Sequence, residues 1–188
     1  MKTYLDLIKQ KALICDECPE LVKNRTNVVF GEGNQSAKIM FIGEAGGRTE
    51  DEMGRPFVGA SGKLLDNIIK ACGWKREDVY ICNCICCRPP NNREPTKNEC
   101  ENCRPFLDAQ IKTVNPEFII LLGTTASGNI LNIPVSRARG SIYDFNGIKT
   151  IATYHPSYLL RSPSKKKDVW EDLQVVIKSL RQDNHENN

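Results

Sequence analysis

Four short apolar runs, each followed by a polar or glycine-containing segment, constrain the fold of this chain more than any other feature. The runs cover residues 38–42, 79–82, 118–122 and 149–153. Runs of this length are typical of buried strands. Helical patterns separate or follow them, at residues 62–72, 96–113, 124–131 and 168–180, and the second of these begins with the capping-box-like Thr96-Lys97-Asn98-Glu99. This alternation predicts a three-layer α/β/α fold with a mostly parallel central sheet of about four strands.

The length and composition are those of one globular domain. The chain has 188 residues, of which 40% are hydrophobic and 26% charged, and a formal net charge of +3. We expect a single domain over residues 1–181 and a disordered polar tail over 182–188. No apolar run approaches the roughly 20 residues that cross a bilayer, and residues 1–9 form an amphipathic helical pattern rather than a signal peptide. We therefore expect a cytoplasmic protein with no membrane association.

Polar side chains stand where the predicted strands end. Glu44 lies in Gly43-Glu44-Ala45-Gly46-Gly47, Asn83 follows the second run, and His155 begins His155-Pro156-Ser157. In such sheets, ligands bind just beyond the carboxyl ends of the strands. The sequence therefore predicts a crevice lined by Glu44, Asn83 and His155, with Gly123 at the end of the remaining strand.

Nine cysteines in a cytosolic protein indicate metal binding or chemistry rather than disulfides. Spacing alone pairs Cys15-x-x-Cys18 with Cys100-x-x-Cys103, a set that could hold zinc through four thiolates. The gap between these pairs is several times that of a zinc ribbon, whereas an iron–sulfur cluster accepts scattered thiolates. Further candidates are Cys84, Cys86 and Cys87, while Cys72 and Cys82 lie in apolar segments as buried thiols. Spacing leaves the choice of metal open.

Several motifs occur together in a specific order. They are Cys15-x-x-Cys18, Gly43-Glu44-Ala45-Gly46-Gly47, Gly54-Arg55-Pro56-Phe57-Val58-Gly59, Asn83-x-x-x-Cys87-Arg88-Pro89-Pro90, Cys103-x-Pro105-Phe106 and Tyr154-His155-Pro156-Ser157. Together they resemble the family 4 uracil-DNA glycosylases, the iron–sulfur group of that superfamily. The resemblance covers nearly the whole chain. It implies an enzyme that hydrolyses the N-glycosidic bond of flipped-out deoxyuridine in DNA, releases uracil and leaves an abasic site for base-excision repair.

The resemblance also implies a cofactor. The residues that match the family's cluster ligands are Cys15, Cys18, Cys87 and Cys103, which would hold a [4Fe-4S] cluster with a structural role. Cys84, Cys86 and Cys100 are then spare. Gly46 departs from the family, which usually carries proline there; glycine frees a loop that proline would stiffen.

A uracil site follows from the same resemblance. Phe57 is expected to stack on the flipped base, and Asn83 to present a donor and an acceptor to its Watson–Crick edge. His155 would donate a hydrogen bond to the O2 side of the leaving base. Backbone amides at Gly43, Ala45 and Gly46 would line the pocket.

Two carboxylates are candidates for the catalytic chemistry. Glu44 is the main candidate to orient water or to offset the positive charge that develops on the sugar, and Glu50 is the second. Two other interpretations of the chain stay open. One is a non-catalytic iron–sulfur module that binds nucleic acid, with a polymerase as candidate partner. The other is a zinc-stabilised interaction domain that uses Cys100.

Contacts with DNA are expected on three segments. Gly59, Ser61 and Gly62 open a helix whose N-terminus suits a phosphate, and Pro156 and Ser157 would hold the DNA backbone. Leu159 or Leu160 would wedge into the gap left by the flipped nucleotide, and Arg161, with Lys165, Lys166 and Lys167, would neutralise phosphates. The expected substrate is single- or double-stranded DNA containing uracil. We expect a monomer, with replication or repair proteins as candidate partners.

Overall fold

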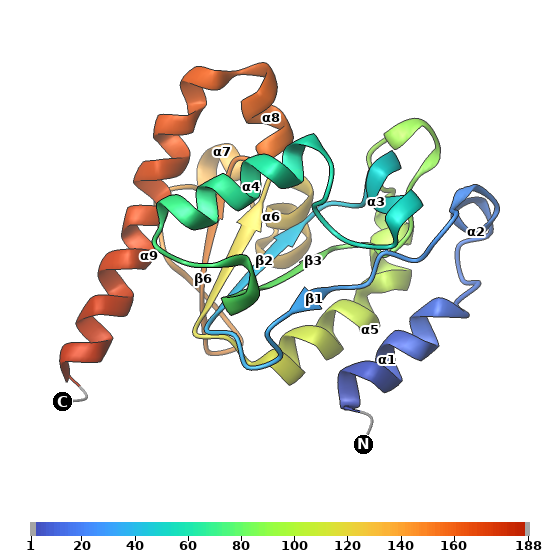
Figure 1. The fold of residues 1–188 in the computed structure, drawn as a ribbon, viewed down its shortest axis with the longest axis horizontal. Helices are drawn as coiled ribbons and strands as arrows, with labels where there is room; N and C mark the ends of the chain where they lie inside the picture. Colours follow the sequence, from blue (N-terminus) through green and yellow to red (C-terminus); the bar gives the residue numbers. More distant parts are fainter. Residues whose placement is uncertain (1–2, 187–188) are drawn as a thin grey trace.

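A six-stranded sheet forms the centre of the computed structural model, which describes residues 3–186. The strand order is β1-β3-β2-β4-β6-β5 (Figure 1). The inner strands are β2 (Ile39–Gly43), β3 (Tyr80–Asn83), β4 (Phe118–Leu122) and β6 (Ile148–Thr153), and they run parallel to one another. These four strands confirm the prediction from the apolar runs.

Two short edge strands add to the four that the sequence predicts. β1 (Glu32–Gly33) pairs with β3, and β5 (Tyr143–Phe145) pairs with β6, both antiparallel. Each has only two or three residues, and these are partly exposed. Neither strand therefore forms an apolar run, and its extended conformation depends on hydrogen bonds to the neighbouring strand.

Helices cover both faces of the sheet, as the three-layer prediction requires. One face carries α1 (Tyr4–Leu13), α5 (Lys97–Val114), α6 (Thr124–Leu131) and α7 (Val135–Ala138), and the other carries α4 (Ala60–Ala71), α8 (Pro156–Arg161) and α9 (Lys166–Glu186) (Figure 1). Successive residues of β2 point to opposite faces, so Met40 packs in the first layer and Phe41 in the second. The connections contain α2 (Pro19–Asn24), α3 (Arg48–Met53), η1 (Arg76–Asp78), η2 (Pro90–Asn92) and η3 (Pro163–Lys165).

Local capping sets the start of two helices. At the start of α5, the Thr96 hydroxyl accepts a hydrogen bond from the Glu99 amide at 3.2 Å, and the Glu99 carboxylate accepts one from the Thr96 amide at 2.8 Å. This is the capping box that the sequence predicts. A second capping box at Thr3 and Asp6 begins α1 later than the expected 1–9, and residues 1–2 lie outside the described part of the chain.

The last helix is longer than the sequence predicts. α9 continues to Glu186 rather than ending near residue 180, so residues 182–186 are helical where a disordered tail is expected. A helix that is already nucleated extends through polar residues at little cost. Residues 187–188 of the expected tail lie outside the described residues. Within residues 3–186, none of the helices combines the length and the apolar character that a membrane span requires.

Backbone pairing continues past the ends of two inner strands. In the register between β2 and β3, Gly43 lies opposite Asn83. Beyond this pair, the amide of Cys84 donates to the carbonyl of Gly43 at 2.9 Å, and the amide of Ile85 donates to the carbonyl of Glu44 at 3.2 Å. These bonds hold the loop after β2 beside the loop after β3, at the edge where all four parallel strands end.

Candidate active site at the carboxyl edge of the sheet

A cavity of about 750 Å³ lies at this edge. Each inner strand contributes residues at or just after its last position: Glu44 after β2, Asn83 on β3, Gly123 after β4 and His155 after β6. The structure therefore brings together the side chains that the sequence places at separate strand ends. The other residues of the predicted site that line the cavity are Ala45, Gly46, Glu50, Phe57, Ser61, Ser157 and Arg161.

Phe57 forms one wall of the cavity in an unusual backbone conformation. Its φ is 51°, in the left-handed region that non-glycine residues seldom occupy. Its ring lies 5.5 Å from the His155 ring, centroid to centroid, at an interplanar angle of 31°. Gly43 lies behind this wall, outside the lining: a Cβ there would approach Phe57 Cζ to 2.6 Å and Asn83 Oδ1 to 2.5 Å. Glycine at position 43 therefore lets the ring and the amide lie together at the strand end.

Asn83 has an acceptor without a partner. The residue is 4% exposed, and its Oδ1 is buried with no hydrogen bond to any residue of the described part of the chain. Leaving a buried acceptor unpaired costs about 1–3 kcal/mol. A hydrogen-bond donor on a bound ligand would remove this cost, so the unpaired oxygen of Asn83 indicates a ligand-binding position.

His155 is held as a neutral imidazole with a defined tautomer. Its Nδ1 accepts a hydrogen bond from the Ser157 amide at 3.1 Å and lies 2.8 Å from the Ser157 hydroxyl. Since Nδ1 accepts, the proton of the neutral ring is on Nε2. Burial lowers the pKa of His155, the charge of Glu50 raises it and the charge of Arg161 lowers it, and the net pKa is about 4. His155 is therefore a neutral N–H donor at neutral pH.

Glu44 and Glu50 have different surroundings. Thr125 Oγ1 donates a hydrogen bond of 2.5 Å to Glu44 Oε2, and Oε1 of Glu44 accepts none from residues 3–186. Burial raises the pKa of Glu44, the Thr125 hydroxyl lowers it, and the charge of Glu94 raises it. One oxygen of Glu44 is thus oriented by the protein, and the other is left for a ligand or water.

The carboxylate of Glu50 is already saturated with backbone donors. It accepts hydrogen bonds from the amides of Gly47 at 3.1 Å, Val58 at 3.1 Å and Gly59 at 2.8 Å, and the residue is 7% exposed. These bonds join the start of α3 to the segment that carries Phe57. They argue against the predicted catalytic role of Glu50, since both of its oxygens already accept backbone amides that hold the cavity wall.

Three predicted DNA contacts, besides Leu159, do not line the cavity. The Gly59 amide donates to Glu50, so it is not available to a phosphate. Gly62 is buried behind Phe57, where a Cβ would lie 2.0 Å from the Phe57 carbonyl carbon. Pro156 is buried as the first residue of α8. Ser61, Ser157 and Arg161 keep positions at the cavity, as described above.

The prediction that Leu159 contacts DNA is wrong, and its neighbour is the better candidate. Leu159 is 0% exposed and packs in the core between the sheet and α4, α8 and α9, whereas Leu160 is 49% exposed. Consecutive residues of a helix point about 100° apart, so Leu160 can face solvent while Leu159 faces the core. Two of the expected phosphate-binding lysines are paired within the chain, Lys165 with Asp168 at 3.0 Å and Lys167 with Glu171 at 3.8 Å.

Several cavity residues were not predicted as part of the site. They are Gly47, Pro89, Asn92, Arg93, Glu94, Leu122, Thr124, Thr125, Val135, Ser136, Tyr154 and Tyr158. The segment 89–94 begins inside a motif that the resemblance uses, which ends at Pro90, so its place at the site could have been inferred from that motif. Thr125 belongs to none of the motifs. Its hydroxyl contacts Glu44, which lies 81 positions away in the sequence, so only the folded structure shows the contact.

Gly46, the departure from the family pattern, is buried in the wall of the cavity. A Cβ at this position would lie 3.1 Å from Glu50 Cβ and 3.2 Å from Val29 Cγ2. These contacts are tight, so any larger residue here requires its neighbours to shift by a few tenths of an ångström. Gly46 therefore shapes the wall next to the Glu50 carboxylate.

The four cysteines matched by the resemblance line a second, small cavity. Cys15, Cys18, Cys87 and Cys103 surround it together with apolar residues of α2. Nitrogen donors point at three of the sulfurs: Arg25 Nη1 at 3.1 Å from Cys87 Sγ, Asn102 Nδ2 at 3.5 Å from Cys18 Sγ, and the Cys86 amide at 3.3 Å from Cys103 Sγ. Such donors stabilise thiolates that bind an iron–sulfur cluster.

The single-zinc interpretation gains no support from the cysteines. All nine are free thiols. Among residues 3–186 no group of three histidine, cysteine or acidic side chains is close enough to hold a single metal ion, and this finding covers the four cysteines of the small cavity as well as any set with Cys100. Cys100 packs with Leu21 and Ile85 in an apolar cluster. Four thiols around one cavity, with donors to the sulfurs, fit a four-thiolate cluster.

Comparison with known proteins agrees with this geometry. A family model described as the uracil DNA glycosylase superfamily matches residues 30–174, and the chain belongs to this superfamily. It is 46% identical over 176 residues to a type-4 uracil-DNA glycosylase of Thermotoga maritima, covering 90% of this chain and 91% of the relative. It is 41% identical over 182 residues to the type-4 enzyme of Archaeoglobus fulgidus, covering 92% and 91%. It is also 26% identical over 152 residues to a DNA polymerase of Bacillus phage SP01, which covers 80% of this chain but 16% of the polymerase.

The neutral state of His155 predicts a pH dependence of stability. In the folded chain the pKa of His155 is about 4, whereas the ordinary pKa of histidine is 6.5. Between these two pH values the unfolded chain therefore binds more protons than the folded chain. The free energy of unfolding should therefore fall as the pH drops from about 6.5 towards 4. Denaturant unfolding at several pH values measures this dependence, and the free energy of unfolding should change less steeply with pH in His155→Gln than in the unaltered protein. His185→Gln is the matched control, and an equal loss of slope in both variants would contradict the assignment.

The burial of Leu159 predicts opposite results for two adjacent leucines. Leu159→Ala should lower the free energy of unfolding by about 2–5 kcal/mol, because it leaves a cavity in the core. Leu160→Ala should change it by no more than about 0.5 kcal/mol, as expected for an exposed position. Equilibrium denaturation followed by circular dichroism measures both values. Equal effects of the two substitutions would show that α8 is oriented differently.

Proposed function

We propose that this chain is a uracil-DNA glycosylase. It hydrolyses the N-glycosidic bond of a flipped-out deoxyuridine, releases uracil and leaves an abasic site, which initiates base-excision repair. Its superfamily and the type-4 uracil-DNA glycosylases among its relatives support this activity. The observation that carries the proposal is one cavity with an aromatic ring, an unpaired amide oxygen and a neutral imidazole donor on its walls.

The cavity offers complementary groups to a uracil base. An enzyme cannot reach a base inside a duplex, so the target nucleotide must rotate out into a pocket. The Phe57 ring supplies a surface for stacking. The Watson–Crick edge of uracil has an N3–H donor next to carbonyl acceptors, and the Asn83 amide has an Oδ1 acceptor and an Nδ2 donor to match. Base binding would thus satisfy the buried Oδ1 that the protein leaves unpaired.

His155 is suited to stabilise the departing base. Cleavage of the glycosidic bond leaves negative charge on uracil, and a fixed donor in a dry cavity stabilises such charge strongly. The Nε2–H of His155 would donate to the O2 side of the base, while the Ser157 amide holds the ring in the required tautomer. Because its pKa is about 4, His155 acts as a neutral hydrogen-bond donor rather than as an acid.

Glu44 is the carboxylate that we assign to water or to the positive charge of the sugar. Thr125 fixes one of its oxygens and leaves the other open towards the cavity. Glu50 has a different role in this proposal. Its bonds to three amides hold the walls of the cavity, so it positions other groups rather than reacting.

For DNA binding we assign Ser61, Ser157 and Arg161 around the cavity entrance, with Leu160 as the wedge. Ser61 is near the start of α4, while Ser157, Leu160 and Arg161 belong to α8. The exposed Leu160 side chain could fill the space that a flipped nucleotide leaves. If Arg161 contacts phosphate, added salt should weaken binding.

We further propose that Cys15, Cys18, Cys87 and Cys103 hold a [4Fe-4S] cluster. When bound, the cluster supplies a covalent link between the N-terminal segment and the segment 87–103. This link would hold part of the cavity wall in place, because Pro89, Asn92 and Glu94 line the cavity and lie shortly after Cys87 in the chain. Asn24 adds to this link by donating to the Arg88 carbonyl at 2.9 Å.

Uracil release from a defined oligonucleotide, followed by alkaline strand scission, tests the activity. Glu44→Ala and Asn83→Ala should each lower the rate about 100-fold or more, because each removes a group that acts on the reacting nucleotide. Glu117→Ala, on the exposed surface near Lys38, is the control and should leave the rate unchanged. If the unaltered protein releases no uracil from single- or double-stranded DNA, the non-catalytic nucleic-acid-binding interpretation replaces this proposal.

Two cysteines on adjacent turns of α5 test the cluster. Cys103→Ala should abolish the visible absorption of an iron–sulfur cluster and lower the melting temperature, since the link it provides is lost. Cys100→Ala should retain the absorption, because Cys100 packs in an apolar cluster. Absorption spectra and iron content measure the result. Loss of bound metal in Cys100→Ala but not in Cys103→Ala would favour the zinc interpretation instead.

A further inference from the structure

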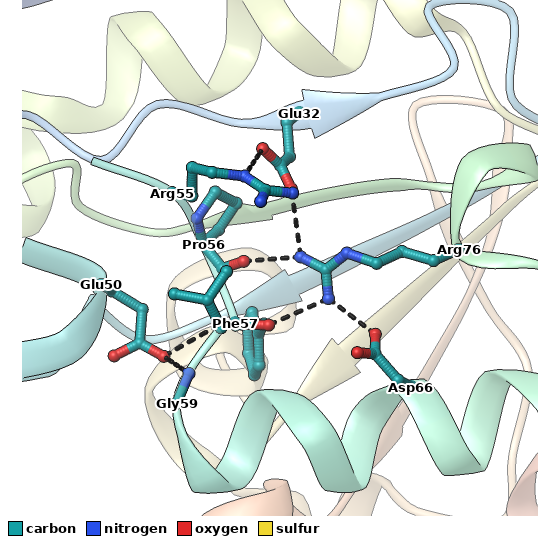
Figure 2. A network of polar contacts seen from close by, with 9 residues as sticks. Glu32, Glu50, Arg55, Pro56, Phe57, Gly59, Asp66 and Arg76 are labelled. Atoms are coloured by element: carbon teal, nitrogen blue, oxygen red, sulfur yellow. Dashed lines mark hydrogen bonds and ion pairs between the residues drawn. The ribbon is translucent and has the colours of Figure 1, made fainter. Parts of the chain in front are cut away.

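The segment that carries Phe57 is held by a charged network outside the cavity (Figure 2). Arg76, from η1, donates to two consecutive carbonyls of this segment: Nη2 to Pro56 O at 2.6 Å and Nη1 to Phe57 O at 2.9 Å. Arg76 does not line the cavity. A single guanidinium thus fixes the peptide groups on either side of the Phe57 Cα.

Arg76 is itself held in place by two carboxylates from other elements. Its Nη1 lies 2.7 Å from Asp66 Oδ1 on α4, and its Nη2 lies 3.2 Å from Glu32 Oε1 on β1. Arg55 binds the same Glu32 through two hydrogen bonds, at 2.9 Å and 2.8 Å. The Arg76 side chain is only 22% exposed. A planar guanidinium with all its neighbours fixed has one orientation, and a lysine could not reproduce its two parallel donors.

The opposite end of the segment is held by an anion. Glu50 accepts hydrogen bonds from the amides of Val58 and Gly59, immediately after Phe57 (Figure 2). The carbonyls of residues 56 and 57 are therefore bound by a cation, and the amides of residues 58 and 59 by a carboxylate. Together these contacts can maintain the left-handed φ of 51° at Phe57, which a free chain would seldom adopt.

We infer that Arg76 is a positioning residue for uracil recognition: it fixes the backbone conformation from which the Phe57 ring projects, without touching the substrate. The inference rests on the proposed function, because it assumes that the ring stacks on the base. Without Arg76, the two carbonyls lose their donors and the segment can relax towards ordinary φ values. The ring would then have to be ordered at the moment of binding, which weakens recognition of the flipped base.

Kinetics of Arg76→Gln test this role. We expect kcat/KM for uracil release to fall by up to about 100-fold, the effect of a misplaced binding group. Arg76→Lys should recover little of the loss, since it keeps the charge but not the two donors. Arg55→Gln is the matched control: it removes a second arginine from the same Glu32 without touching either carbonyl, and its activity should be unchanged. Equal losses in Arg55→Gln and Arg76→Gln would overturn the inference, because a general effect of the charged network would then explain both.

A double-mutant cycle with Phe57→Ala separates positioning from simple stabilisation. If Arg76 acts through the ring, Arg76→Gln should have almost no further effect on kcat/KM in the Phe57→Ala background. Additive losses would show that Arg76 acts independently of Phe57 and would overturn the inference.

A measurement without activity distinguishes this failure from failure of the proposed function. In protein labelled with ¹³C-phenylalanine, the ring signal of Phe57, assigned with Phe57→Leu, should shift or broaden in Arg76→Gln and not in Arg55→Gln. An unchanged ring signal in Arg76→Gln overturns the positioning role even if the enzyme is active. A changed signal in a protein that releases no uracil supports the positioning of Phe57 and rejects only the glycosylase activity.

Discussion

The arrangement of the site depends on one constraint, the common edge at which four parallel strands end. Gly43 lies opposite Asn83 in the register of β2 and β3, and β4 and β6 end beside them. The hydrogen-bonded ladder leaves little freedom in this register, because both faces of the sheet are buried under helices. Residues far apart in sequence therefore meet at one cavity, and the missing side chain at Gly43 provides the space in which Phe57 and Asn83 approach each other.

Environment separates the roles of two glutamates only six positions apart. Glu50 accepts three backbone amides and serves as a fixed anion that shapes the walls. Glu44 accepts a single hydroxyl, and burial together with the charge of Glu94 raises its pKa. A carboxylate can orient water or face a developing positive charge only while it keeps an unoccupied oxygen, which is the situation of Glu44. The surroundings of His155 likewise determine the role that we propose for it. Burial keeps the ring neutral, and the Ser157 amide determines which nitrogen carries the proton.

The cysteine site and the cavity are mechanically connected. Segment 87–94 begins at a cysteine of the second cavity and continues as a wall of the first. Arg93 lies in this wall and pairs with Glu99 on α5 and with Glu20 on α2. Groups around the cysteines therefore also hold the wall. This connection gives a physical reason why the proposed cluster would affect the shape of the cavity without taking part in the proposed reaction.

Features that depend on local sequence patterns could be predicted from the sequence. The apolar runs predicted four inner strands, Thr96 and Glu99 predicted the start of α5, and polar residues after the runs predicted which side chains would gather at one edge. The choice of four cysteines needed the family resemblance, because spacing also allowed Cys100. The burial of Leu159 beside an exposed Leu160, the three amides bound to Glu50, and the contacts of Thr125 with Glu44 and of Arg76 with the Phe57 segment are visible only in the folded structure. These features depend on how elements far apart in the sequence pack against one another. Hydrophobic periodicity and motif spacing are local properties of the sequence, so they do not predict such contacts.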